Sequence, residues 1–250
     1  GLDYFDSVLL TGDYQAQDIR TLEHLRELPE KQLVTVGCTY LDVFAEKLKQ
    51  IPQETSHPFT VLVSPSWGAS GLLSRFGAKL LDPLVKTGWR IIVRPHPQSK
   101  KSEAAMLENL TKQYSNTPNL CWDYERDNIF SLSKSDIMIS DFSGIIFDYV
   151  FLCDKPVMYV KQGIDLRPYD ADDLDHELWQ FMVLQEIGLE LKEEDFSIIG
   201  EVITRVFDNA TYKNACQKAK ETAWQYPGEA GNRIANFMLE VRRAVEKTSA

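Results

Sequence analysis

The stretch that decides the fold reads SDIMISDFSGIIFDYVFLCDKPVMYV and covers residues 135–160. It begins with an apolar strand pattern at 136–140, continues with an apolar helical pattern at 143–152, and ends with a second strand pattern at 156–160. Two strand patterns joined by a helical one are typical of the βαβ unit, in which the strands run parallel. The stretch therefore predicts an α/β protein with a parallel sheet.

The same alternation continues along the rest of the chain. Further strand patterns lie at 7–10, 33–36, 59–64, 89–94 and 119–122. Further helical patterns lie at 16–28, 39–49, 70–86, 101–115, 127–134, 196–208, 211–225 and 229–246. This order predicts a Rossmann-like, doubly wound parallel sheet with helices on both faces.

A linker divides the predicted elements into two parts. The segment KQIPQETSHPF, at 49–59, carries two prolines between two patterned regions. We therefore expect residues 1–50 to form a short strand–helix–strand piece, which is the remnant of an N-terminal domain or the link to one. Residues 58–250 are expected to form the Rossmann-like domain, with a helical C-terminus.

Composition and charge argue against several classes of protein. The chain has 250 residues and a net charge of −10, without a run of lysine or arginine, which argues against nucleic-acid binding. The four cysteines are far apart and form no CxxC pair, so we expect no disulfide framework or zinc site, and a reducing compartment. No apolar stretch is long enough to span a membrane, and the first residues do not read as a signal peptide.

No cofactor or metal is expected. An acid-rich run contains Asp170, Asp172, Asp173 and Asp175. Such a run is more often a solvated acidic loop than a cation site. We interpret it in that way.

Small polar residues stand between the strand and the helix of the deciding stretch, at Ser140, Asp141, Phe142, Ser143 and Gly144. One interpretation is structural, because Ser and Asp side chains cap helices by accepting hydrogen bonds from free backbone N–H groups. The other is chemical, because the N-terminus of a helix after a parallel strand binds phosphate readily. The stretch alone leaves both interpretations open.

Two further strand ends carry residues suited to an anion. The strand IIVR runs into Arg94-Pro95-His96-Pro97, and the two prolines stiffen this loop. The strand at 59–64 runs into Pro65, Ser66, Trp67 and Gly68, where small residues let backbone N–H groups approach a ligand. Because ligands bind beyond the carboxyl ends of parallel strands, we expect Ser66, Arg94 and Ser143 on one edge of the sheet, facing a common cleft.

In the order SPSWG, RPHP and SDIMISDFSGIIFDYVFLCDKPVMY, the chain resembles the CDP-glycerol glycerophosphotransferase family, whose members build teichoic acids and related alditol-phosphate polymers. The resemblance implies the C-terminal, donor-binding domain of a GT-B-type transferase. It implies that Arg94 and His96 contact the diphosphate and act in catalysis, and that Ser143 and its helix hold the donor phosphates. The substrate-binding set implied is Ser66, Trp67, Gly68, Asp141, Phe142, Ser143, Gly144 and Asp148, although Asp141 and Asp148 are equally well explained as a cap and a structural carboxylate.

The activity implied is transfer of glycerol phosphate, or a related alditol phosphate, from a CDP-alditol to a hydroxyl of a lipid-linked or saccharide acceptor of the cell wall or surface, with release of CMP. The parent protein would be cytoplasmic and at most peripheral on the inner face of the membrane. Two alternatives stay open: a UDP-sugar glycosyltransferase or 2-epimerase-like nucleotide-sugar enzyme, and a nucleotide-binding module without catalysis.

The chain departs from the family pattern at three places. Gly144 stands where the family has a second serine, and Pro65-Ser66-Trp67-Gly68 lacks the arginine of the family's PTWR-like stretch. The histidine–glycine segment that supplies a candidate catalytic base is missing, since the sequence starts at about the point where the family's N-terminal domain ends. The chain therefore resembles the donor-binding half of a larger enzyme, and this half is not expected to carry the base.

Overall fold

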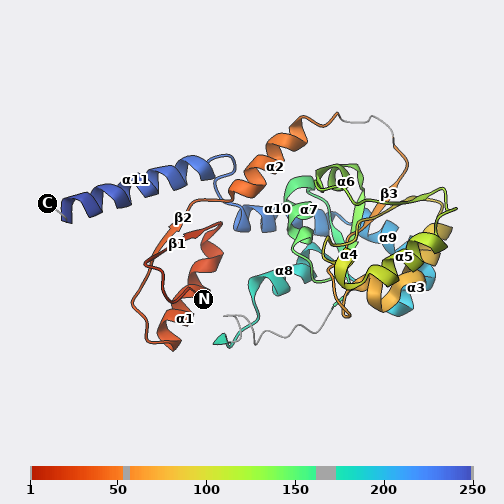
Figure 1. Ribbon diagram of the computed structural model, residues 1–250, viewed down its shortest axis with the longest axis horizontal. Coiled ribbons are helices and arrows are strands. Elements are labelled where there is room, and N and C mark those ends of the chain that lie inside the picture. Colours follow the sequence, from red (N-terminus) through yellow and green to blue (C-terminus); the bar gives the residue numbers. More distant parts are fainter. Residues whose placement is uncertain (1, 53–56, 162–172, 249–250) are drawn as a thin grey trace.

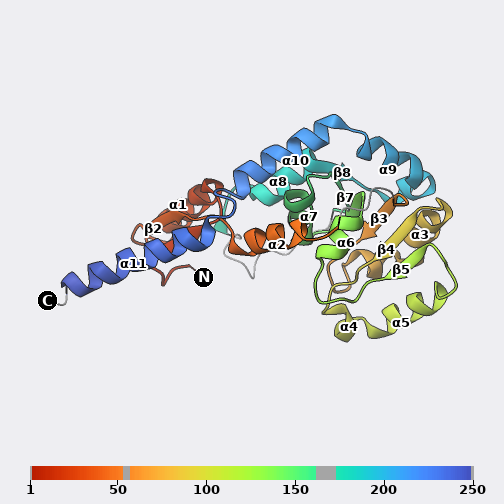
Figure 2. The ribbon, with the colours of Figure 1, turned by 90° about the horizontal axis from the view of Figure 1, so that it is seen from above.

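The computed structural model describes residues 2–52, 57–161 and 173–248. Its centre is a six-stranded parallel sheet, to which β3 in Figure 1 belongs. The strands follow the order β5-β4-β3-β6-β7-β8 (Figure 2). The strands are β3 (Thr60–Val63), β4 (Arg90–Val93), β5 (Leu120–Trp122), β6 (Ile137–Ser140), β7 (Val157–Tyr159) and β8 (Gly188–Glu190). The predicted parallel α/β fold is confirmed, and β8 is a strand that the sequence pattern did not predict.

The sheet divides the apolar core into two clusters. Val61 and Val63 belong to one cluster, whereas Leu62 between them belongs to the other. Successive side chains of a strand point to opposite faces, and both faces are covered here. For this reason the strands are almost wholly apolar instead of alternating with polar residues.

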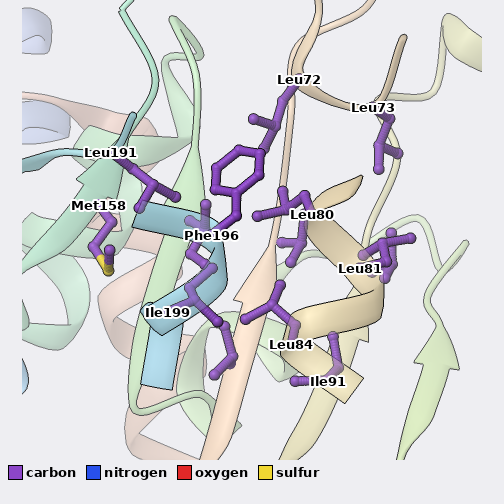
Figure 3. Close-up of a cluster of buried hydrophobic side chains, with 14 of the residues drawn as sticks. Leu72, Leu73, Leu80, Leu81, Leu84, Ile91, Met158, Leu191, Phe196 and Ile199 are labelled. Carbon is purple, nitrogen blue, oxygen red and sulfur yellow. The ribbon is translucent and has the colours of Figure 1, made fainter. Parts of the chain in front are cut away.

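Helices cover both faces. On the first face lie α3 (Leu72–Lys86), α5 (Ala104–Gln113), the 3-10 helix Glu193–Ile198 and α9 (Ile199–Phe207). Figure 3 shows Leu80 and Leu84 of α3 in this cluster, together with Phe196 and Ile199. On the second face lie α2 (Thr39–Lys49), α6 (Ile129–Lys134), α7 (Ile145–Cys153), α8 (Trp179–Ile187) and α10 (Ala210–Ala223). The short helix α4 (Ser99–Ser102) follows β4.

A separate pair of strands lies in the N-terminal part. β1 (Ser7–Leu10) pairs in parallel with β2 (Gln32–Thr35), and the 3-10 helix Asp13–Gln15 and α1 (Ala16–Leu25) connect them. Within the expected 1–50 piece, α2 packs on α6 and α7 of the large unit. The small two-stranded unit therefore ends before α2.

The C-terminal helices return to this N-terminal part. α11 (Ala230–Thr248) projects from the large unit alongside β2 (Figures 1 and 2), and Arg233 donates to the carbonyl of Thr35 at 3.2 Å. Asp42 of α2 accepts hydrogen bonds from the indole of Trp224 (2.9 Å) and from the backbone N–H groups of Gly228 (2.8 Å) and Ala230 (3.1 Å). This carboxylate fixes the point where α11 begins.

Within the described residues, no helix is both long and apolar enough to cross a membrane.

Candidate functional site

The order of the strands indicates a candidate ligand site between β3 and β6. The chain proceeds from β3 to β4 and β5 on one side, and then crosses to β6 on the other side of β3. At such a switch point the loops that leave neighbouring strands diverge and open a crevice at the carboxyl ends. The β3–α3 loop (residues 64–71) and the β6–α7 loop (residues 141–144) meet there, and Arg94 follows the neighbouring strand β4. Ser66, Arg94 and Ser143 therefore lie on one edge of the sheet, as predicted.

Asp141 joins the two loops of the switch point. Its carboxylate accepts hydrogen bonds from the backbone N–H of Ser66 at 2.7 Å and of Leu72 at 2.8 Å. The hydroxyl of Ser140 donates to the carbonyl of Ser64 at 2.6 Å. Asp141 is 1% exposed, so both of its carboxylate oxygens serve the protein. Asp141 therefore supports the two loops, which agrees with its interpretation as a structural carboxylate, and a contact with the substrate stays a prediction.

The β3–α3 loop presents backbone and an aromatic ring at the site. Gly68 has a φ of +95°, a conformation that favours glycine, and a side chain built there would meet no atom within 4 Å. Trp67 is 51% exposed, and its ring centre lies 6.4 Å from that of His96. The β3–α3 loop and the loop after β4 therefore touch through these two rings.

The hydrogen bonds of His96 determine which ring nitrogen can serve a ligand. Its Nδ1 accepts a hydrogen bond from the backbone N–H of Gln98 at 3.1 Å. The neutral ring then carries its proton on Nε2, which is a donor. His96 is half-buried, and its Nε2–H suits an acceptor such as a phosphate oxygen.

Glu103 adds a carboxylate that the sequence analysis did not identify. Burial raises the pKa of this carboxyl, but hydrogen bonds from Ser102, Ser99 and the backbone of Gly68 outweigh burial and lower it. A protonated His96 would shift the pKa of Glu103 in the same direction. Its Oε2 atom is buried and has no hydrogen-bond partner in the described part of the chain. Glu103 therefore links the β3–α3 loop to the segment that follows His96.

Arg94 points to a different partner from the one expected. Its guanidinium pairs with Asp123 at 2.5 Å and donates to the carbonyl of Glu125 at 2.7 Å. Asp123 also accepts from the hydroxyl of Ser131 and from the backbone of Glu125. Arg94 is 8% exposed. The guanidinium thus holds the loop after β5, and its contact with a diphosphate stays a prediction.

The N-terminus of α7 is open toward the switch point. Gly144 is its N-cap, and no side chain caps it. Within the described residues, the backbone N–H groups of Gly144 and Ile145 and the hydroxyl of Ser143 have no hydrogen-bond partner. Backbone N–H groups of this kind and the helix dipole favour an anion. Among the described residues Ser143 makes no capping bond, and the interpretation of the SDFSG stretch as a phosphate site stays a prediction.

Asp148 lies in the first turn of α7 and takes part in a polar cluster. Its carboxylate accepts from the hydroxyl of Tyr40 at 3.0 Å and from the amide of Asn128 at 3.5 Å. Burial raises the pKa of Asp148, and these two hydrogen bonds oppose the shift. The Oδ1 atom of Asn128 is buried without a hydrogen-bond partner in the described residues.

The remaining predicted site residue, Phe142, packs against Phe181 of α8, with ring centres 4.6 Å apart. In the acid-rich run, Asp170 and Asp172 lie outside the described residues. Asp173 pairs with Arg26 at 2.5 Å and Asp175 with His176 at 3.2 Å. No group of three metal-ligating side chains is placed to hold a metal ion within the described ranges.

Comparison with known proteins gives one family. A family model described as CDP-glycerol:poly(glycerophosphate) glycerophosphotransferase matches residues 46–240. The minor teichoic acid biosynthesis protein GgaB of Bacillus subtilis (strain 168) is 23% identical over 185 residues, which are 71% of this chain and 19% of that protein. The residues that the family model matches, 46–240, contain all three strand ends of the candidate site.

Two solved structures share the fold. The wall teichoic acid polymerase TagF superposes with a TM-score of 0.57 at 17% identity, over 98% of this chain and 59% of the other. The UDP-GlcNAc 2-epimerase of Neisseria meningitidis, bound to UDP-GlcNAc, superposes with a TM-score of 0.58 at 15% identity, over 94% of this chain and 61% of the other. The chain therefore spans less than two thirds of the length of these relatives.

Proposed function

Because the chain belongs to the CDP-glycerol:poly(glycerophosphate) glycerophosphotransferase family, we propose that it is the donor-binding part of a transferase. In this proposal, glycerol phosphate or a related alditol phosphate moves from a CDP-activated donor to a hydroxyl of a cell-wall or surface polymer. CMP is the product that leaves. The observation that carries the proposal is the meeting of the β3–α3 loop and the uncapped N-terminus of α7 at the switch point of the sheet.

The reaction would be a phosphoryl transfer. The acceptor oxygen forms a bond to the β-phosphorus, and the bond from that phosphorus to the bridging oxygen breaks. CMP departs with the bridging oxygen and its electron pair, and the hydroxyl proton passes to a base. Such transfers depend on positioning the reactants and on stabilising charge at the phosphoryl oxygens.

The residues of this chain would supply the electrostatic part. The free N–H groups of Gly144 and Ile145 and the hydroxyl of Ser143 would donate to phosphate oxygens, and His96 Nε2–H would donate from the neighbouring loop. Arg94 would act indirectly, because its guanidinium holds the loop after β5. Donors fixed before the ligand arrives need no rearrangement as charge develops.

The acceptor and the membrane are further parts of the proposal. We propose that the parent protein uses a lipid-linked or saccharide acceptor. It would be cytoplasmic and at most peripheral at the membrane. The exposed part of α11 supports contact with a membrane surface. There Met238 (60% exposed) and Val241 (38% exposed) lie near Arg242 and Arg243 in the sequence. Apolar side chains beside basic ones suit an anionic lipid surface.

The preference of the chain for one nucleotide over others tests whether the donor is a CDP derivative. We expect CDP to bind the chain at least about tenfold more tightly than UDP, the scale of one or two hydrogen bonds to the base. Calorimetric titration with CDP, CMP, UDP and ADP measures this preference. Tighter binding of UDP would instead support the nucleotide-sugar alternative. Release of CMP from CDP-glycerol by the full-length parent protein separates the enzyme from a non-catalytic module.

Ser143 tests the phosphate site. We expect Ser143→Ala to weaken CDP binding about tenfold, the scale of one charge-assisted hydrogen bond. The melting temperature should hardly change, because Ser143 makes no capping bond among the described residues.

His96→Ala should also weaken CDP binding. If His96 and Ser143 contact one diphosphate, the double variant should lose less binding free energy than the two single variants lose together. Unchanged affinity with a lowered melting temperature would make Ser143 a structural residue only.

A further inference from the structure

A small pocket lies beside the candidate phosphate site, on the side of β7 and β8. It encloses about 50 Å³ and begins at Phe142, the residue before Ser143. Its walls come from the ends of β6, β7 and β8 and from α8, and they include Tyr159, Phe181 and Glu190. The pocket therefore shares the carboxyl edge of the sheet with the donors proposed for the phosphates.

The polar groups of the pocket are mostly hydrogen-bond acceptors. Glu190 stands at the end of β8, Glu177 precedes α8, and Gln185 lies on α8. Neither glutamate has a side-chain hydrogen bond or an ion pair within the described residues. Among the described residues of the lining, Lys161 is the one basic side chain, and no ion pair joins it to either glutamate there. These acceptors are available to a ligand.

The apolar groups give the pocket rigid walls. The rings of Phe142 and Phe181 contact each other in a tilted arrangement with their centres 4.6 Å apart, and Tyr159 is 5% exposed. Burial, followed by the charge of Glu190, raises the pKa of Tyr159 to about 12. The phenol thus keeps its proton at neutral pH and offers both a donor and an acceptor.

We propose that this pocket receives the polyol end of the CDP-alditol donor, an inference that rests on the proposed function. Hydroxyl groups are the donors that free carboxylates and an amide oxygen require, so a polyol would satisfy Glu177, Gln185 and Glu190 together. The same carboxylates repel a phosphate. The donor would therefore lie with its diphosphate at Ser143 and its polyol toward Glu190.

The size of the pocket narrows the class of ligand. One water-sized group needs about 10–15 Å³ on this measure of volume. A pocket of about 50 Å³ therefore holds about three to five such groups. The glycerol end of a CDP-glycerol donor brings a number within this range, since it has three carbons and two free hydroxyls. A hexose ring is too large to enter completely.

The test compares CDP with CDP-glycerol on the full chain by calorimetry. We expect CDP-glycerol to bind about tenfold more tightly than CDP, the scale of one or two charge-assisted hydrogen bonds. In Glu190→Gln, which keeps the volume and removes the charge, this advantage should fall to about twofold while CDP affinity stays unchanged. Glu177→Gln, at an exposed position outside the core, should act in the same direction without affecting folding.

A matched control comes from the same helix. Glu186 is exposed on α8 and does not line this pocket, so Glu186→Gln should bind both ligands as the wild-type chain does. Equal affinity of the wild-type chain for CDP and CDP-glycerol would overturn the pocket assignment and leave the proposed function intact. An equal loss for both ligands in Glu190→Gln would also overturn it. If neither ligand binds the wild-type chain, the proposed function fails and the assignment fails with it.

Discussion

Replacing Asp141 with alanine is expected to lower the free energy of unfolding by about 3–5 kcal/mol, because each buried backbone N–H left without an acceptor costs about 1–3 kcal/mol. The carboxylate serves two backbone N–H groups, one on the half-buried Ser66 and one on the buried Leu72, and Asp141 is 1% exposed. In a chain of this size the melting temperature should fall by about 10 °C. CDP affinity should fall as well, since the two loops of the switch point lose their common support.

The control for this variant is Glu201→Ala. Glu201 is exposed on α9, so its removal should change the melting temperature by no more than about 2 °C. Thermal melts and urea unfolding of both variants measure the difference. If Asp141→Ala melted like Glu201→Ala but no longer bound CDP, Asp141 would be a direct ligand contact, as the sequence analysis placed it.

Breaking the pair of Arg94 and Asp123 should have an effect of similar size. Arg94→Met leaves the carboxylate of Asp123, whose side chain is 14% exposed, without its cation. Breaking a buried pair in this way costs about 3–5 kcal/mol. The double variant Arg94→Met/Asp123→Leu should recover much of this loss, because it removes both charges. Urea unfolding of the two variants and the wild-type chain measures the recovery.

Ligand binding by the double variant decides the role of Arg94. If Arg94 only positions the loop after β5, CDP affinity should recover along with stability. If stability recovers and CDP affinity stays about tenfold or more below that of the wild-type chain, the guanidinium contacts the diphosphate directly. The comparison thus separates support from contact in one pair of measurements.

The pH dependence of the free energy of unfolding is a second test of the ion pair between Arg94 and Asp123. Burial raises the pKa of Asp123, but hydrogen bonds from Ser131 and Glu125 and the nearby Arg94 outweigh burial and lower it. A carboxyl whose pKa is lower in the folded state stabilises the fold above its unfolded pKa of about 3.9 and loses this effect as the pH falls through its folded pKa. The penalty of Arg94→Met should therefore be smaller near pH 3 than at pH 7.

The sequence predicted all the strands that carry the site because each is a continuous apolar run between turn residues. It did not predict β8, which has three residues and begins with Gly188. A side chain at Gly188 would meet the carbonyl oxygen of Val157 at 2.0 Å. The close approach of two backbones therefore requires a residue that carries no strand signal of its own.

The edge of the sheet on which the site lies was predictable, but the partners of its side chains were not. Alternating strands and helices indicate a parallel sheet, and a parallel sheet gathers all strand ends at one edge. The partner of Arg94 is 29 residues away, and those of Asp141 are 75 and 69 residues away. Such pairs depend on strand order, which no local pattern encodes.

The three hydrogen bonds of Asp42 have a consequence for biosynthesis. Its partners are Trp224, Gly228 and Ala230, which lie 182, 186 and 188 residues later in the chain. At a synthesis rate of about 5–20 residues per second, about 10–40 seconds pass on the ribosome between the emergence of α2 and that of its partners. During this time the face of α2 that later meets the C-terminal helices is open to chaperones. The hydrogen bonds between α2 and the C-terminal helices of the large unit can therefore form only after those helices have left the ribosome.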